Sequence, residues 1–147
     1  MEVLSKNDGL LTDLEVLEIL EEKRFNREKE SRDNIPREGA VPCDLRQRDV
    51  IERCVVDYLS MTQKNVNSKQ ARNFFSEIES LCMKSAEEKG LAGVNLSFEE
   101  LTQICNHRPL SELDISLLIQ DCHLRCSVNQ VEIIIDLVKS CFEVEED

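Results

Sequence analysis

The feature that most constrains this chain is a helix-start pattern that occurs five times. In each case a residue that can cap a helix stands three positions before a side chain that can reach back to it, usually beside apolar residues. The five pairs are Thr12 with Glu15, Asn67 with Gln70, Ser97 with Glu100, Ser111 with Asp114, and Ser127 with Gln130. The sequence therefore predicts a chain built mainly of helices.

Apolar residues between these starts recur at helical spacing. The three clearest stripes are Ile51, Cys54, Val55, Tyr58 and Leu59; Ala71, Phe74, Phe75, Ile78 and Leu81; and Val131, Ile134, Ile135, Val138, Cys141 and Phe142. With only four Gly, three Pro and 4% aromatic residues, the chain lacks the frequent tight turns of a sandwich or barrel. We expect an all-α fold of about six helices.

Two segments interrupt the helical pattern. Residues 26–42 are charged, contain an Ile-Pro and a Val-Pro step, and lack an apolar period, so they are typical of a mobile connector. Lys84 to Asn95 includes Gly90 and Gly93 and predicts a long loop between helices. The predicted organisation is an N-terminal segment at 1–25, a flexible linker at 26–43, a helical bundle at 44–142 and an acidic tail at 143–147.

The cysteine content and the net charge limit which kinds of protein this chain can be. Seven Cys, an odd number in a chain of 147 residues, argue against a disulfide framework and favour a reducing compartment, the cytosol or nucleus. No run of about 18 apolar residues predicts a membrane span. The net charge is −12, and residues 96–147 hold three basic residues against eleven acidic ones. We therefore expect no direct nucleic-acid binding by this C-terminal third.

One group of side chains has the composition of a structural zinc site: Cys105, His107, Cys122 and Cys126. The spacing argues against zinc, because Cys105-x-His107 is no recognised knuckle and the flanking helices already have apolar stripes. Buried core thiols are the favoured interpretation. We predict no metal and no cofactor.

Catalysis is not indicated either. A Cys–His nucleophile would need a third orienting group and oxyanion donors, and neither His107 nor His123 stands beside a Gly-rich turn. No phosphate-binding loop, dinucleotide fingerprint, metalloprotease or calcium-loop motif is present. The sequence predicts a protein that is not an enzyme.

The stretch Asn106, His107, Arg108 and Pro109 predicts a structural corner. The residue before a proline is disfavoured in the α region, so the preceding helix should end at about residues 106–108. Asn106 can cap that end, Arg108 can interact with the exposed carbonyls, and Ser111 can start the next helix. We expect His107 to hydrogen-bond across the corner.

These residues also carry a family resemblance. The NHRP motif, the LSELDI helix start after it and the final apolar helix resemble the small stalk subunit of eukaryotic RNA polymerase III. This family is related to the fourth subunit of RNA polymerase II and to the corresponding subunit of archaeal polymerase, and its animal member is called the calcitonin gene-related peptide receptor component. The opening LLTDLEVLEILEEKR is similar to the family's N-terminal segment. Residues 55–81 fit more loosely, and Lys84 to Asn95 is an insertion.

The resemblance implies a non-catalytic, nuclear subunit whose HRDC-like helical bundle follows an N-terminal docking helix. That helix would bind the larger OB-fold stalk subunit as a heterodimer. Further partners would be the polymerase core and transcription initiation factors, at genes for tRNA and other small RNAs. The expected partner-binding residues are Leu11, Leu14, Val16, Leu17 and Leu20. In agreement, the apolar residues from Leu14 to Leu20 span an arc of about 220°, more than a helix on one surface needs.

Two alternatives remain at this stage. The chain could be the small stalk subunit of RNA polymerase II, since only NHRP favours the third polymerase. It could instead be a free-standing cytosolic helical adaptor of the receptor-component type, because exposed helix faces serve either role.

Overall fold

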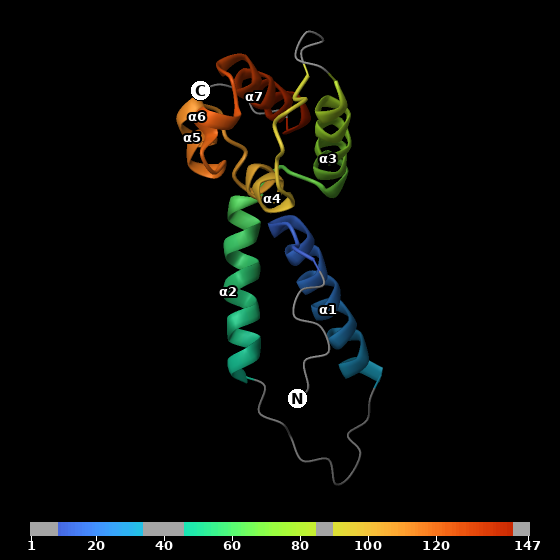
Figure 1. The fold of residues 1–147 in the computed structure, drawn as a ribbon. Helices are drawn as coiled ribbons and strands as arrows, with labels where there is room; N and C mark the ends of the chain where they lie inside the picture. The colour runs from blue at the N-terminus through green and yellow to red at the C-terminus, as the bar shows by residue number, and fades with distance from the viewer. Residues whose placement is uncertain (1–8, 34–45, 85–89, 143–147) are drawn as a thin grey trace. The chain divides into compact units, whose positions relative to one another are not determined.

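The structure is a computed structural model that describes residues 9–33, 46–84 and 90–142. Its elements are α1 (Asp13–Asp33), α2 (Arg46–Thr62), α3 (Ser68–Met83), α4 (Phe98–His107), α5 (Glu112–Leu118), α6 (Cys122–Arg125) and α7 (Val128–Phe142) (Figure 1). All of the regular structure in the described residues is helical, which confirms the predicted fold class. The short α6 is the helix that the sequence pattern did not predict.

The helices form two compact units, each of which is described by itself. One unit covers Asp13–Asn65 and consists of α1 and α2. The other contains α3 to α7 and, among the described residues, 9–12 and those from Val66 onward. The sequence analysis placed α2 in a bundle that starts at residue 44, whereas its contacts group it with α1. We therefore describe α3 to α7 as the bundle and α1 with α2 as a separate helix pair.

Helix α1 continues to Asp33, beyond the predicted end at residue 25. The extension is rich in Glu, Lys and Arg, which favour helix without any apolar stripe. Arg24 Nε donates to Glu28 Oε1 one turn on, at 3.3 Å, and Arg27 pairs with Glu52 of α2. The predicted connector is thus helical in its first part, and its remainder lies outside the described residues.

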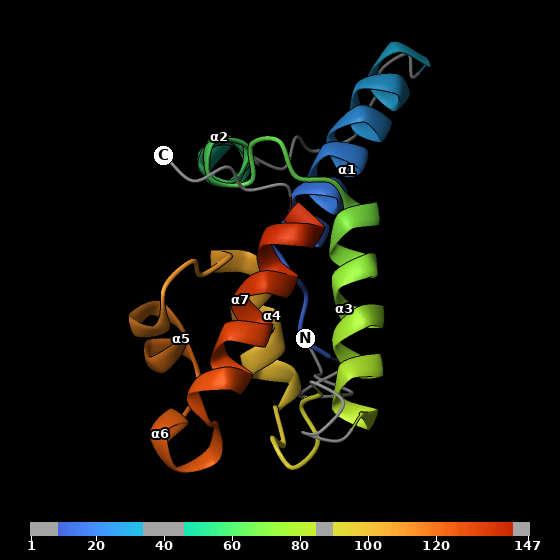
Figure 2. The same ribbon diagram turned by 90° about the horizontal axis from the view of Figure 1, so that it is seen from above.

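The core of the bundle lies around α7, which sits between α3 and α5 in both ribbon views (Figures 1 and 2). Phe74, Ile78, Ile104, Ile115, Ile134 and Val138 are each at most 1% exposed. The rings of Phe74 and Phe142 lie 5.6 Å apart between centroids and join α3 to α7. The stripe predicted for α7 is buried throughout, and in the stripe predicted for α3 Ala71, Phe74 and Ile78 are buried while Phe75 and Leu81 are half-buried.

Four of the predicted helix starts are present as hydrogen-bonded caps. Asn67 and Ser97 each form a reciprocal capping box, with Gln70 and Glu100. Ser127 and Gln130 also exchange hydrogen bonds, through the Ser127 N–H at 3.0 Å and the Gln130 N–H at 3.4 Å. The Ser111 hydroxyl accepts from the Asp114 N–H at 3.2 Å. These caps satisfy backbone donors that the first helical turn leaves free.

Part of the Lys84–Asn95 insertion belongs to the core. Leu91 is fully buried and Val94 is 3% exposed. The Leu91 N–H donates to the Leu81 carbonyl at 2.8 Å, and the Ala92 N–H donates to the Lys84 carbonyl at 3.0 Å, so the segment folds back onto the end of α3. A Cβ at Gly90 would lie 2.1 Å from the Lys84 oxygen, which explains glycine there. Residues 85–89 of the insertion lie outside the described residues.

A charged hub connects this segment to α4 and α6. The buried Glu100 carboxylate accepts from both Arg125 guanidinium nitrogens, at 2.5 and 3.0 Å, and from the backbone N–H groups of Ser97 and Gln120. Arg125 also donates to the carbonyls of Gln120 and Asn95. The hydrogen bonds from Arg125, followed by those from Ser97 and Gln120, lower the pKa of Glu100 despite its burial.

Replacing Glu100 should show what this hub contributes. Folding lowers the pKa of the Glu100 carboxyl below its value in the unfolded chain, 4.5. The ionised carboxylate therefore adds to the free energy of unfolding above pH 4.5, and this stabilisation is lost as the pH falls through the lower pKa of the folded state. Glu100→Gln should therefore cost about 1–3 kcal/mol at pH 7, and the cost should shrink below about pH 4. Urea unfolding at a series of pH values measures both effects.

Glu99→Gln is the matched control, because the neighbouring Glu99 side chain is exposed. It should change the free energy of unfolding by less than about 0.5 kcal/mol at every pH. Equal effects of the two substitutions at pH 7 would contradict the role assigned to the hub.

Candidate partner interface

Helices α1 and α2 are joined by polar contacts spaced along the pair. Arg27 Nη1 donates to Glu52 Oε1 at 3.1 Å, and Gln63 Nε2 donates to Asp13 Oδ2 at 3.4 Å. The hydrogen bonds from Arg27 lower the pKa of the Glu52 carboxyl, and the same bonds raise the pKa of Arg27. These contacts define which side of each helix faces the other.

Two of the predicted docking residues share the α2-facing side of α1. Asp13, Val16, Leu20 and Arg27 are spaced by three, four and seven residues, which places them on one helix face. Val16 and Leu20 are half-buried there. Both side chains are therefore partly engaged by α2 within the chain itself.

The other three predicted docking residues differ from one another in exposure. Leu14 is 7% exposed, Leu17 is half-buried, and Leu11 is 53% exposed and belongs to the bundle unit rather than to the α1–α2 pair. The sequence analysis expected the wide apolar arc of this helix to meet a partner. The structure leaves Leu11 and part of Leu17 accessible and buries Leu14.

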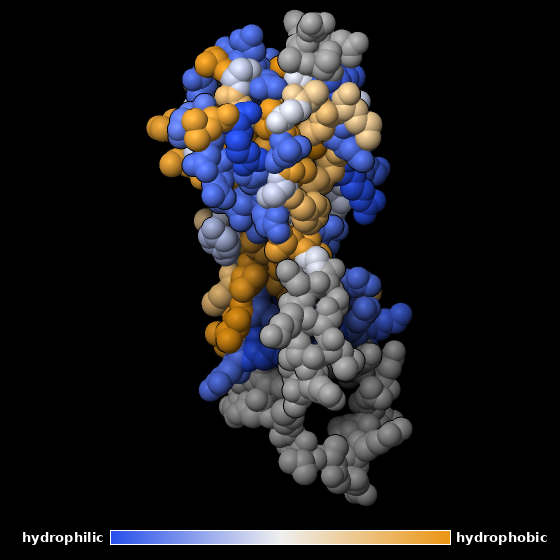
Figure 3. All heavy atoms as spheres, viewed as in Figure 1, coloured by the Kyte–Doolittle hydropathy of each residue, from blue (hydrophilic) through white to orange (hydrophobic). Residues whose placement is uncertain are grey.

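The largest exposed apolar surface of the pair lies on α2 and was not predicted. Five apolar side chains of α2 are exposed: Val50, Ile51, Cys54, Tyr58 and Met61. At about 100° per residue they fall within an arc of about 100°. We call this set the α2 apolar face, and hydrophobic residues are visible along α2 in Figure 3.

The α2 apolar face points away from α1. Glu52 and Gln63, which bond to α1, and the buried Leu59 lie on the opposite side of the helix. The apolar stripe at Ile51, Cys54 and Tyr58 predicted this helix, and the structure shows that these three side chains are exposed. The apolar period identified the helix, but it could not show which side a neighbour covers.

An exposed apolar face of this kind is typical of a protein-binding surface. Ile51, Tyr58 and Met61 are each more than 60% exposed, and they follow one another along the helix over almost three turns. Contiguous apolar patches on soluble proteins mark interaction sites, and Tyr is enriched among the residues that dominate binding energy. The α2 apolar face is the strongest candidate interface of the α1–α2 unit.

The predicted corner after α4 is present, with one correction. Helix α4 ends at His107, Arg108 adopts a left-handed conformation at φ 48°, and its N–H donates to the Ile104 carbonyl at 2.8 Å. Pro109 is buried before the Ser111 cap of α5. His107 does not bond across the corner: its Nε2 lies 3.1 Å from Gln103 Oε1, one turn back on the same helix, and the ring is exposed.

The cysteines of the hypothetical zinc set are packed rather than gathered around a site. Cys105 and Cys122 are buried and Cys126 is half-buried, as expected for core thiols. Burial and the neighbouring Cys122 raise the pKa of Cys126 to about 11, which keeps its thiol protonated at neutral pH. In the parts of the chain that the structure describes, no three His, Cys, Asp or Glu residues are arranged to hold a metal ion.

Not one of the described helices combines the length and the apolar character that crossing a bilayer requires.

The exposed position of His107 gives a testable expectation for the corner. Because its hydrogen bond is on the surface, His107→Ala should change the free energy of unfolding by less than about 0.5 kcal/mol. Thermal or urea unfolding measures this. A loss above about 1.5 kcal/mol would mean that His107 holds the corner together after all.

Comparison with known protein families gives a match that spans both units. The family model described as RNA polymerase Rpb4 matches residues 10–142. The matched range includes α1, the α2 apolar face and the whole described part of the bundle.

Proposed function

Because the chain belongs to the RNA polymerase Rpb4 family, we propose that it is the small stalk subunit of RNA polymerase III. The family consists of non-catalytic polymerase subunits that form a stalk heterodimer with an Rpb7-like subunit. The chain is thus a polymerase stalk subunit and not an enzyme in itself. The assignment to the third polymerase, to the nucleus and to initiation at tRNA and other small RNA genes is the further step of the proposal.

The assignment to polymerase III rests on the NHRP corner and the α5 start that follows it. Asn106 to Pro109 and the LSELDI segment resemble the small stalk subunit of this polymerase, and the RNA polymerase II subunit is the alternative. Initiation factors and the polymerase core would be further partners. No observation in the described α1–α2 pair or bundle favours a free-standing cytosolic adaptor.

Purification from nuclear extract should identify the polymerase. The tagged chain is expected to recover the largest subunit that is specific to polymerase III, detected by mass spectrometry. Recovery of the largest subunit of polymerase II in its place would assign the chain to that enzyme. Recovery of neither would support the adaptor.

The observation that carries the heterodimer proposal is the α2 apolar face. We propose that this face and Leu17 of the α1–α2 pair contact the larger OB-fold subunit, and that Leu11 of the bundle unit makes a separate contact with it. A stable interface buries about 800 Å² on each partner, and its affinity is concentrated in a few aromatic and apolar anchors. Tyr58 and Ile51 supply such anchors about two turns apart. Val16, Leu20 and the buried Leu14 would then stabilise the folded chain by packing inside it, with little direct contact to the partner.

Charged substitutions should show how much the α2 apolar face and the docking residues of α1 each contribute to complex formation. Ile51→Asp with Tyr58→Asp places two carboxylates on the α2 apolar face, and the coexpressed larger subunit should no longer copurify as a 1:1 complex. Leu17→Asp with Leu20→Asp should also weaken the complex. Size-exclusion chromatography measures complex formation, and circular dichroism checks that the helices remain.

Met83→Asp is the matched control, because Met83 is 79% exposed on α3 and lies in the other unit. It should leave the complex intact. Wild-type binding by the Ile51→Asp, Tyr58→Asp variant would show that the α2 apolar face is not the docking surface. Wild-type binding by both double variants would contradict docking through α1 and α2 altogether.

A further inference from the structure

A second exposed apolar surface lies on the bundle, on α5. Leu113 is 70% exposed and Leu117 is 78% exposed, although both belong to a helix whose Ile115 is fully buried. They are four residues apart and therefore form one row on the side of α5 that faces away from the core. Figure 3 shows hydrophobic residues among hydrophilic ones over α5 and α6.

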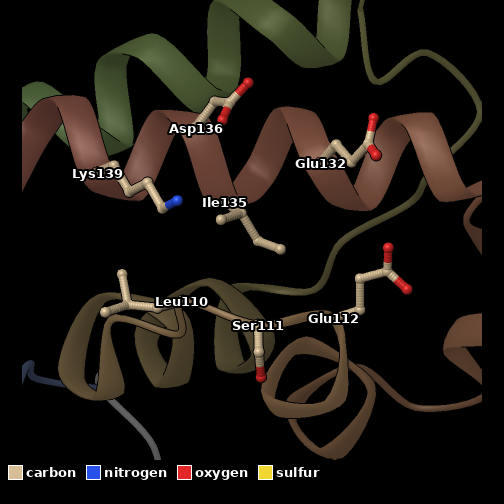
Figure 4. A pocket seen from close by; sticks show the side chains of 7 residues that line it. All are labelled: Leu110, Ser111, Glu112, Glu132, Ile135, Asp136 and Lys139. Atoms are coloured by element: carbon tan, nitrogen blue, oxygen red, sulfur yellow. The ribbon is translucent and has the colours of Figure 1, made fainter. Parts of the chain in front are cut away.

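A hollow of about 340 Å³ lies between the start of α5 and α7, and its lining residue Glu112 directly precedes Leu113 in the chain. Leu110, Ser111 and Glu112 line one wall, and Glu132, Ile135, Asp136 and Lys139 line the other. In Figure 4, Glu112 and Glu132 lie at one end of the hollow, Leu110 and Lys139 at the other, and Ile135 between them. The hollow is thus apolar in its middle and acidic at one end.

The described part of the chain does not neutralise the acidic end. Within the described residues, neither Glu112 nor Glu132 has an ion-pair or hydrogen-bond partner. Asp114 lies on the other flank of the leucine row, about 100° around α5 from Leu113, and its carboxylate accepts from the Ser111 hydroxyl. The exposed leucines are therefore bordered by carboxylates on both sides.

The charge and shape of this surface determine which kind of ligand can bind to it. From this surface we propose that α5 and the hollow beside α7 bind an amphipathic helix of a partner protein, whose apolar side chains are flanked by Lys or Arg. The partner's apolar side chains would cover Leu113 and Leu117, and a basic side chain would enter the hollow between Glu112 and Glu132. Such helix-in-groove binding uses anchors at spacings of three and four residues.

Other classes of ligand fit this surface poorly. A nucleic acid or an anionic bilayer would bring phosphates toward Glu112, Glu132 and Asp114, and like charges repel. A purely apolar helix would leave the carboxylates of Glu112 and Glu132 without partners at a desolvated edge. The proposed surface is in the bundle and does not depend on the α2 apolar face or on the identity of the polymerase.

A designed peptide tests the proposal directly. The probe is a fluorescent peptide of about 14 residues made of Leu and Lys at helical spacing, with a Leu and Glu peptide of the same pattern as its counterpart. Binding is measured by fluorescence anisotropy on the chain in complex with the larger stalk subunit, or on the chain alone if that subunit does not bind. The Leu–Lys peptide should bind, and the Leu–Glu peptide should not.

Variants of the leucine row test the apolar part of the surface. Leu113→Ser with Leu117→Ser should weaken binding of the Leu–Lys peptide about tenfold or more. Met83→Ser removes a side chain of equal exposure from α3, on the other side of α7, and should leave the affinity unchanged. Equal affinities for the leucine variant and the wild type would overturn the proposal.

Charge reversals test the acidic part and control for unspecific attraction. Glu112→Lys with Glu132→Lys should abolish binding of the Leu–Lys peptide, whereas Glu21→Lys with Glu79→Lys, at two exposed sites elsewhere, alters the net charge equally and should preserve it. If the two pairs weaken binding equally, the attraction is unspecific and the proposal is wrong. Tighter binding of a 20-nucleotide RNA than of the peptide would also overturn it.

Discussion

The bundle depends on the interaction between Glu100 and Arg125. Two charges with little access to water are tolerated only when nearly every hydrogen-bonding position around them is filled. Here the carboxylate takes the backbone donors of Ser97 and Gln120, and the guanidinium donates to the carbonyls of Gln120 and Asn95. The pair thus fixes the entry to α4, the turn after α5 and the end of α6 at once. Since α7 begins three residues after Arg125, the same hub sets where α7 meets α5.

The helices of the bundle have more of their apolar surface covered than those of the α1–α2 pair, because most of them have more neighbouring helices. In the bundle, α7 has α3 on one side and α5 on another, so most of its apolar residues are covered. A pair of helices can cover only one side of each member. Helix α2 uses its covered side for Leu59 and for the polar contacts of Glu52 and Gln63, which leaves Ile51 and Tyr58 exposed. A partner protein is the usual means by which such a face is covered.

Local chemistry made part of this structure predictable. The caps at Asn67, Ser97 and Ser127 were predicted because a cap is decided within four residues, and the stripes of α3 and α7 because both are covered by the same bundle. The exposed side of α2 was not predictable, because an apolar period is the same whether the chain or a partner covers it. The polar C-terminal part of α1 was not predicted as helix, because it has no apolar period and is stabilised by ion pairs.

Long-range contacts account for the remaining differences. Leu91 and Val94 lie in a segment with two glycines and no period, and nothing local shows that they fill the core beside Leu81. His107 was expected to bond across the corner, but the left-handed turn at Arg108 leaves its ring beside Gln103 on the same helix. Glu100 was predicted only as a capping partner. Its larger role requires Arg125, whose position depends on the turn after α5.

The distribution of charge separates the two exposed apolar surfaces chemically. Beside the α5 leucines stand Glu112 and Asp114, and residues 96–147 carry few basic side chains of any kind. Arg53 and Asp57 border one side of the α2 apolar face, and Arg48 beside the other side pairs with Asp49 and Glu52, so neither sign of charge dominates. An uncharged apolar partner suits the second surface, and only a basic one suits the first. The two proposed surfaces therefore differ in the chemistry of the partner that each would bind, and a change in charge at one should not alter binding at the other.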